Sequence, residues 1–140
     1  MSYIVQGIID ENLTGHNDHY WGERNTFIDC RSRFLKISPN SFWGFSNTII
    51  TMSHDISEGN FGPMTEKKVW VDDWAWISSN CILYNCWIKS NAIVSCGSVV
   101  SSVVVEKFCM VQGNPAKVVA KFINGKWTRL EVAEELKRWK

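Results

Sequence analysis

The stretch VDDWAWISSNCILYNCWIKSNAIVSCGSVV, residues 71–100, carries a large aliphatic residue at regular intervals of six. The repeated positions are Val71, Ile77 and Leu83 and then, after one step of five, Ile88, Val94 and Val100. A period of six matches neither the 3.6-residue turn of an α-helix nor the period of two of a long strand. The stretch therefore predicts short strands that are separated by tight turns.

Three such hexads make one coil of a parallel β-helix, and an upstream block (Ile37, Trp43, Ile49) has the same spacing. Coils of this kind stack at about 4.8 Å, with the aliphatic residue of every hexad pointing inward. A β-sandwich is the rival interpretation, but residues 68–112 contain neither proline nor a long turn signal. We expect one domain over residues 1–140: a cap or first coil (1–34), the β-helix (35–120) and a C-terminal unit (121–140).

Two segments depart from the hexad pattern. EGNFGPMTEKK, residues 58–68, is rich in glycine and proline, so it predicts a loop that leaves the coil and returns shortly after His54. FINGKW, residues 122–127, predicts a hairpin turn at Asn-Gly. The final residues TRLEVAEELKRWK begin with a capping-box pattern at Thr128 and Glu131, which predicts a terminal α-helix. Its apolar face would carry Leu130, Ala133, Leu136 and Trp139.

The composition is that of a globular domain, with 140 residues of which 45% are hydrophobic and 21% charged. A net charge of +1 gives no field that would collect nucleic acid or anionic lipid. No apolar run approaches the roughly 20 residues of a membrane span. The start, MSYIVQGIIDEN, lacks the features of a signal peptide, so we expect a cytoplasmic protein.

The cysteines and histidines do not form a metal-binding or disulfide pattern. The five cysteines are an odd number without a C-x-x-C pair, and we interpret them as small buried apolar residues (Cys30, Cys81, Cys86, Cys96, Cys109). HNDH, residues 16–19, could be read as a metal site, but a third ligand of suitable spacing is missing. We favour a solvated loop there and expect no metal.

Three stretches resemble the hexapeptide-repeat acyltransferases, and among them the colanic-acid-type O-acetyltransferases of polysaccharide biosynthesis. They are SHDI at 53–56, VDDWAWISSNCIL at 71–83 and AIVSCGSVVSSVVVEKFCMVQGNPAKVV at 92–119. The resemblance implies an all-β, left-handed parallel β-helix that assembles as a homotrimer. It also implies acetyl-CoA as co-substrate, bound in a groove between neighbouring prisms.

His54 matches the histidine that serves as general base in this family. Imidazole suits that role because the ordinary pKa of a histidine is about 6.5. A neutral His54 would remove the proton of a sugar hydroxyl as the oxygen attacks the thioester, and would then pass that proton to the leaving thiolate. The second ring nitrogen would donate to a backbone carbonyl or to Asp55, which could equally be a turn residue.

The resemblance also implies a set of coenzyme A contacts. Trp76 would lie beside the thioester, with Ser79 near it; Cys96 would bind the pantetheine through its backbone, Ser101 would lie along the same groove, and Lys117 would meet the nucleotide phosphates. The chain departs from the family at Ser102, where lysine is common, and at corner positions where glycine is common (Asp72, Ser78, Lys89). Trp76 could instead be a coil-face aromatic residue, and Lys117 a solvated charge.

The sequence thus predicts an acetyl-CoA-dependent O-acetyltransferase that acts on a carbohydrate hydroxyl. The alternative is a non-catalytic trimeric β-helix module for glycan binding or assembly. A γ-type carbonic anhydrase is disfavoured because the repeat region holds a single histidine. Tryptophan is abundant, with eight residues. Aromatic rings can stack on sugars, but we favour subunit packing for Trp43, Trp70, Trp74 and Trp87.

Overall fold

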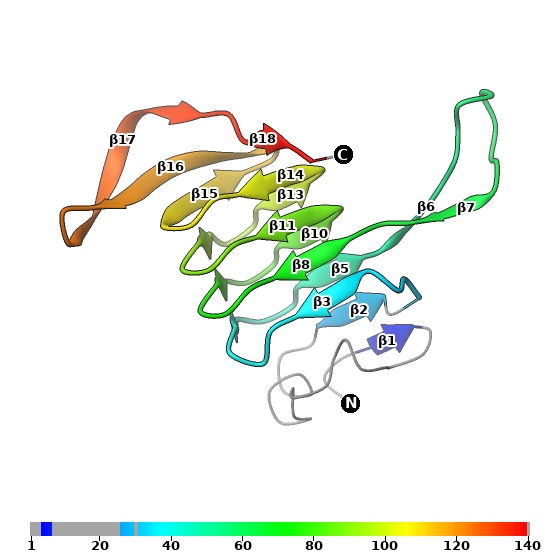
Figure 1. Cartoon of the computed structure of the whole chain (residues 1–140), viewed down its shortest axis with the longest axis horizontal. Helices are drawn as coiled ribbons and strands as arrows, with labels where there is room; N and C mark the ends of the chain where they lie inside the picture. Colours follow the sequence, from blue (N-terminus) through cyan, green and yellow to red (C-terminus); the bar gives the residue numbers. More distant parts are fainter. Residues whose placement is uncertain (1–3, 7–25, 30, 140) are drawn as a thin grey trace.

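The computed structural model describes residues 4–6, 26–29 and 31–139. Its core is a stack of triangular coils (Figure 1), each built from short strands on three faces. Sheet A contains β1 (Ile4–Gln6), β2 (Phe27–Asp29), β5 (Thr48–Ile50), β10 (Ile82–Tyr84) and β13 (Val99–Ser101). Sheet B contains β3 (Leu35–Ile37), β8 (Val69–Val71), β11 (Cys86–Ile88), β14 (Val103–Val105) and β18 (Lys137–Arg138).

Sheet C contains β4 (Phe42–Trp43), β9 (Trp76–Ile77), β12 (Ile93–Val94), β15 (Cys109–Gly113), β16 (Ala116–Ile123) and β17 (Lys126–Glu134). Within the coils, strands of successive turns pair in parallel, and Trp43, Ile77, Val94 and Val111 lie in register. Equivalent hexad positions therefore fall directly above one another, as the sequence period requires.

The inward column is closed to solvent. Ile77, Leu83, Ile88, Val94 and Val100 are all 0% exposed. The step of five residues between Leu83 and Ile88 recurs between Val100 and Val105, and both steps fall at the corner between sheets A and B. A single left-handed residue turns this corner in each coil, Asn85 (φ 47) or Ser102 (φ 56), so the corner needs one residue fewer.

Two predictions about individual residues are partly wrong. Cys81, Cys86 and Cys109 are buried as expected, but Cys96 is exposed at a corner; Cys30 lies outside the described residues. Trp43 is 4% exposed and belongs to the core, so it does not serve subunit packing. Its ring nitrogen donates to Ser41 Oγ at 2.8 Å, which allows a tryptophan to occupy an aliphatic position.

The predicted C-terminal helix is wrong, whereas the Asn-Gly hairpin before it is confirmed. Asn124 (φ 52) and Gly125 (φ 80) make the turn, and β17 then returns antiparallel to β16. The free edge of β16 offers hydrogen-bonding groups to the residues that follow the turn, while an isolated helix of this length is marginal. Leu130 and Leu136 still pack against the core, but from strand positions.

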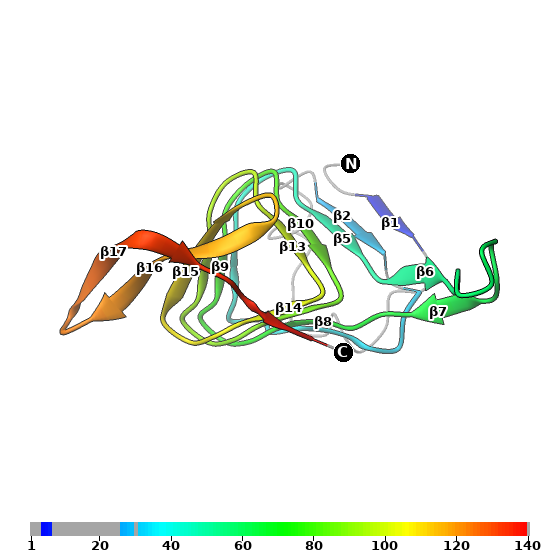
Figure 2. The same ribbon diagram turned by 90° about the horizontal axis from the view of Figure 1, so that it is seen from above.

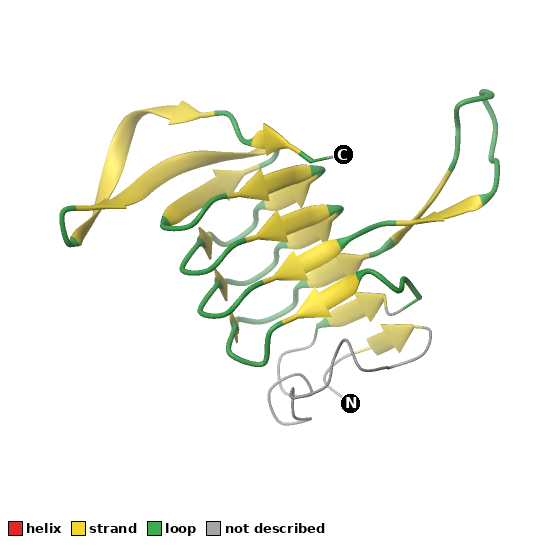
Figure 3. Ribbon diagram, viewed as in Figure 1, coloured by secondary structure: helices red, strands yellow, loops and turns green. Residues whose placement is uncertain are grey.

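Figure 3 shows strands and loops, and no helix, in the described residues. The described part of the chain accordingly contains no helix that is long and apolar enough to cross a membrane. Seen from above (Figure 2), the prism carries two projections: β6 (Met52–His54) and β7 (Met64–Glu66) at one side, and the β16–β17 hairpin at the other.

Candidate active site

A two-stranded arm leaves the corner between sheets A and B. It consists of β6 (Met52–His54) and β7 (Met64–Glu66), which pair antiparallel with His54 opposite Met64. The first part of the loop predicted from EGNFGPMTEKK forms the tip of this arm, whereas Met64–Glu66, which belonged to the same prediction, is the returning strand β7. The tip carries large apolar side chains, with Ile56 66% and Phe61 87% exposed.

His54 lies exposed at the end of β6, and its ring is held by the tip. Nδ1 is 2.8 Å from the carbonyl oxygen of Gly62. A carbonyl can only accept, so Nδ1 must carry the hydrogen, and Nε2 is left with a lone pair that can accept a proton. The predicted hydrogen bond to a backbone carbonyl is therefore confirmed. The ring also contacts Phe61, with centroids 5.7 Å apart.

Asp55 shapes the turn beside this histidine. Its carboxylate accepts the backbone N–H of Ser57 at 2.9 Å, and hydrogen bonds from Ser57 lower the pKa of the carboxyl group. Its backbone carbonyl accepts the N–H of Gly62 at 2.7 Å. A Cβ atom at Gly62 would lie 2.5 Å from that same carbonyl oxygen, so the turn requires glycine. Of the two roles considered for Asp55, the structure supports that of a turn residue.

The base of the arm is anchored in the first coils. Asp29 is 1% exposed and pairs with Arg31, whose Nε lies 2.7 Å from Oδ1. Thr51, the last residue before the arm, donates its hydroxyl to the backbone carbonyl of Asp29 at 2.8 Å. On the returning side, Ser32 Oγ donates to the carbonyl of Lys67 at 2.9 Å. Both ends of the arm are thus tied to residues 29–32.

Burial and hydrogen bonding act in opposite directions on Asp29. Burial favours the neutral acid, but hydrogen bonds from Arg31 and Thr51 and the charge of Arg31 outweigh it, so the pKa of Asp29 lies below its usual value. Nothing in the sequence marks this group, because a lone aspartate in a region of weak periodicity carries no motif.

Three of the residues expected to contact coenzyme A gather at the corner between sheets C and A. Ser79 and Cys96 follow the paired strands β9 and β12, and Gly97 N donates to Ser79 O at 2.9 Å. Lys117 pairs with Gln112, one coil further on. Ser101 ends β13 and lies at the corner between sheets A and B instead. The structure therefore separates Ser101 from the other three.

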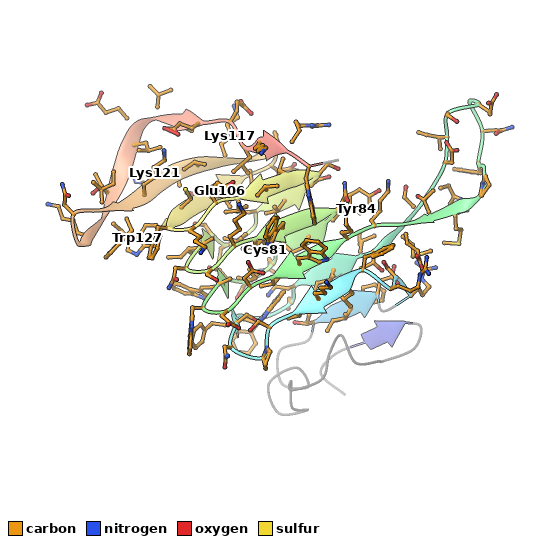
Figure 4. The ribbon with its side chains drawn as sticks, in the orientation of Figure 1. Cys81, Tyr84, Glu106, Lys117, Lys121 and Trp127 are labelled. Atoms are coloured by element: carbon orange, nitrogen blue, oxygen red, sulfur yellow. The ribbon has the colours of Figure 1, made fainter. Side chains whose placement is uncertain are left out.

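Lys117 is not a free charge in this chain. Its Nζ lies 3.1 Å from Oε1 of Glu135, an exposed carboxylate beyond β17. Figure 4 shows Lys117 and Lys121 on β16 and Trp127 on β17, the two strands of one hairpin. A phosphate at Lys117 would have to compete with this ion pair, which is worth little because both partners are partly exposed.

Trp76 lies on the outer face of sheet C and lines a pocket of about 540 Å³. One side of this pocket is the sheet, and the other is the projecting β16–β17 hairpin. Six aromatic side chains line it: Phe42, Trp74, Trp76, Phe108, Phe122 and Trp127. The remaining lining residues are Asn91 and Ile93.

Two of these aromatic residues adopt a backbone conformation that bulky side chains rarely take. Trp74 has φ 65 and Phe108 has φ 59, with Asn91 (φ 63) between them at the equivalent corner of the middle coil. The left-handed region costs a non-glycine residue about 1 to 2 kcal/mol. The 17-residue spacing of Trp74, Asn91 and Phe108 is the sequence signal that could have located this corner.

The buried thiols are unsuited to covalent chemistry, and the described residues hold no metal-binding cluster. Burial raises the pKa of the Cys81 and Cys109 thiols, and raises that of Cys86 to about 12, so these thiols stay protonated. In residues 4–6, 26–29 and 31–139, no three histidine, cysteine or acidic side chains are close enough to hold a metal ion. The HNDH segment lies outside the described residues.

His54 and Trp76 lie on opposite sides of the prism. The arm projects from the corner between sheets A and B, and sheet C is the face across from that corner, as Figures 1 and 2 both show. One chain therefore does not bring the predicted base and the predicted thioester contact together.

Comparison with known proteins supports the architecture. The chain matches no protein-family model and no curated protein sequence. Among solved structures it resembles a maltose O-acetyltransferase from Clostridium difficile 630, with 23% identity and a TM-score of 0.61 over 70% of this chain and 53% of that one.

Two further structures are similar at lower identity. A hexapeptide-repeat acetyltransferase from Vibrio cholerae O1 biovar eltor, in complex with acetyl-CoA, is 19% identical with a TM-score of 0.58, and the match covers 71% of this chain and 55% of that one. A galactoside acetyltransferase in complex with coenzyme A is 15% identical with a TM-score of 0.59, over 79% and 56%. The chain thus spans about half the length of these proteins. The predicted left-handed parallel β-helix is confirmed.

Proposed function

We propose that this protein transfers an acetyl group from acetyl-CoA to a hydroxyl group of a carbohydrate, with His54 as general base. The observation that carries the proposal is the hydrogen bond from His54 Nδ1 to the Gly62 carbonyl at 2.8 Å. It fixes the tautomer whose Nε2 can accept a proton, and it does so on an exposed arm that a substrate can reach. The likeness of the fold to acetyltransferases, two of them in complex with coenzyme A or acetyl-CoA, supports this choice.

In the proposed reaction, Nε2 of His54 takes the proton of the acceptor hydroxyl as its oxygen attacks the thioester carbonyl. The C–S bond then breaks, and His54 returns the proton to the departing thiolate, so that the imidazole ends neutral as it began. Acid–base assistance of this kind is worth about 10² to 10⁴ in rate. Ser79, Cys96 and Lys117 would bind the coenzyme along the corner between sheets C and A, and Trp76 would lie at its reactive end.

The proposed site would need a second copy of the chain, because the arm that ends in His54 and the sheet C strand that holds Trp76 lie on opposite sides of one prism. We therefore include a cyclic homotrimer in the proposal, in which the arm of one copy approaches sheet C of another. The apolar arm tip, with Phe61 87% exposed, is consistent with such a contact. Polysaccharide biosynthesis as the biological setting and a cytoplasmic location remain predictions from the sequence.

The test is thioester turnover with a panel of saccharide acceptors, followed by mass spectrometry for an added acetyl group. We expect His54→Ala to lower kcat by about 10² or more while coenzyme A binding is retained. Ser53→Ala, the adjacent change on the same strand, is the matched control and should stay near wild type. Turnover by a well-folded His54→Ala protein at the wild-type rate would favour the non-catalytic glycan-binding module instead.

A further inference from the structure

Two aromatic clusters lie on the outer faces of the prism, and they differ in how they are covered. On sheet B, Trp70, Trp87 and Trp139 pack together with ring centroids 5.1 to 6.0 Å apart. Lysine ammonium groups lie over these rings, Lys68 at 4.4 Å from Trp139 and Lys89 at 4.6 Å from Trp87. Trp139 from the C-terminal segment and the lysines beside the strands of sheet B therefore cover Trp70 and Trp87.

The pocket on sheet C has walls but no such cover. Phe42, Trp74 and Trp76 on the sheet side are 51%, 53% and 49% exposed. On the hairpin side, Phe122 N donates to Phe108 O at 2.9 Å, and the rings of these two residues stack with centroids 5.9 Å apart. The hairpin is thus fixed to the coil stack while the space between the two walls stays open to solvent.

Backbone strain indicates that the rings of Trp74 and Phe108, at the corner between sheets B and C, are placed for an external contact. Trp74 and Phe108 occupy left-handed positions, whereas corner positions with positive φ elsewhere in the coils hold small or amide residues such as Asn80 and Gly97. Neither ring is buried in the core, with Trp74 53% and Phe108 44% exposed. Core packing therefore does not compensate for the strain, which is typical of residues held for binding.

The chemistry of the lining selects the ligand. All lining side chains are uncharged, so the pocket offers no partner for a charged group. Asn91 places one carboxamide among the rings, and none of the hydrogen bonds of the described residues involves it. A pure hydrocarbon would leave this carboxamide unsatisfied, whereas a sugar ring can stack its C–H face on an aromatic ring and bond the carboxamide through a hydroxyl.

We propose that this pocket is a binding site for a neutral saccharide, held by stacking on Trp74 and Phe108 and by a hydrogen bond to Asn91. Its volume of about 540 Å³ falls within the usual range for small-ligand pockets. That the bound saccharide is also the acetyl acceptor rests on the proposed function, and the neighbouring Trp76 would then bring the two substrates together. Binding itself requires neither acetyl-CoA nor His54.

The test measures binding of maltotriose, cellotriose and lactose by saturation-transfer NMR and calorimetry, without acetyl-CoA. We expect the wild type to bind at least one of them. Trp74→Asn and Phe108→Asn should each weaken that binding by about 3- to 10-fold, and the double variant by more. Because asparagine tolerates the left-handed region, the Tm of the variants should equal or exceed that of the wild type. Phe34→Asn, at an exposed phenylalanine outside the pocket, is the control for saccharide binding.

Three results would overturn the proposal: no binding by the wild type, undiminished binding by the double variant, or loss of binding together with a lower Tm or a changed sedimentation coefficient. The last result would identify the pocket as a packing surface between copies of the chain. Failure of the proposed function looks different, because a wild type that binds saccharide but does not turn over acetyl-CoA keeps this inference intact. Acetyl-CoA turnover by the wild type together with undiminished saccharide binding by the double variant would overturn this inference and leave the proposed function intact.

Discussion

The β6–β7 arm and the outer side of sheet C lie across the prism from each other and differ in kind. The arm is polar where it holds His54: one imidazole, one carbonyl and a turn closed by backbone hydrogen bonds. Sheet C instead carries an exposed aromatic surface, and its corner with sheet A carries Ser79 and Cys96. Under the proposed function, proton transfer and substrate binding would fall to separate regions, which can be altered independently.

Gly62→Ala should produce the largest selective effect on the arm. The added Cβ would lie 2.5 Å from the Asp55 carbonyl, so the turn must shift and the Gly62 carbonyl must leave His54. We expect kcat to fall by about 10- to 100-fold, because small displacements of a reacting group have effects of this size. The KM for acetyl-CoA and the Tm should change little, since the arm tip lies outside the core.

Steady-state kinetics of Gly62→Ala beside Asn60→Ala checks this prediction. Asn60 is exposed on the same tip, so its replacement should leave kcat near the wild-type value. An equal loss in both variants would mean that the tip as a whole matters, and the particular hydrogen bond does not.

Asp29→Asn tests the base of the arm through stability. The pKa of Asp29 is lowered in the folded protein, so the ionised carboxylate adds stability above its unfolded pKa of about 3.9 and loses it as pH falls through the lower folded value. At pH 7 we expect a loss of about 1.5 to 3 kcal/mol, the range of a hydrogen bond to a charged group.

Thermal unfolding as a function of pH measures this contribution. The difference in Tm between the wild type and Asp29→Asn should narrow as the pH falls below about 4 and through the lowered pKa of Asp29 in the folded protein. Glu131→Gln, at an exposed position of β17, should show a smaller difference. If the difference in Tm between the wild type and Asp29→Asn stays constant across the acid range, the effect of the substitution comes from packing and not from the charge.

Lys117→Ala should have the smallest effect. It should change the KM for acetyl-CoA, whereas Gly62→Ala should change kcat. We expect the KM for acetyl-CoA to rise about 3-fold with kcat nearly unchanged, because an exposed point charge contributes modestly to phosphate binding. Glu135→Gln removes the ion-pair partner at 3.1 Å and should lower the KM slightly.

Acetyl-dephospho-CoA gives the control for Lys117. If Lys117 binds the missing phosphate, the wild type and Lys117→Ala should have similar KM values for this substrate. A KM for acetyl-CoA that does not respond to Lys117→Ala would place the lysine on the solvated surface.

The coil stack could be predicted because its cause is local and repeated. Ile77 and Val94 each mark a short strand whose aliphatic side chain points inward, and their spacing alone sets the register of sheet C. The C-terminal helix was mispredicted because Thr128 and Glu131 carry a real local helix signal. The edge of β16, which the sequence does not display beside them, offers a strand partner that outweighs this signal.

The candidate site was predictable only in part. His54 was assigned through its match to the histidine of the family that the sequence resembles, and a backbone carbonyl was one of the two partners expected for its second ring nitrogen. The aromatic pocket could not be predicted, because Phe122 and Trp127 reach Phe42 and Trp76 through a hairpin that folds back over the sheet. The separation of His54 from Trp76 likewise depends on which corner of the coil each residue follows.

The most direct test of the account mixes two damaged proteins. His54→Ala and Trp76→Ala carry different affinity tags and are co-expressed, and mixed trimers that hold both tags are isolated. Each parent variant should be nearly inactive. If a site combines the arm of one copy with sheet C of another, the isolated mixed trimers should show about a third of wild-type activity, because one of the three sites in each such trimer joins an intact arm to an intact face. Activity no greater than the sum of the two parents would contradict a site shared between copies.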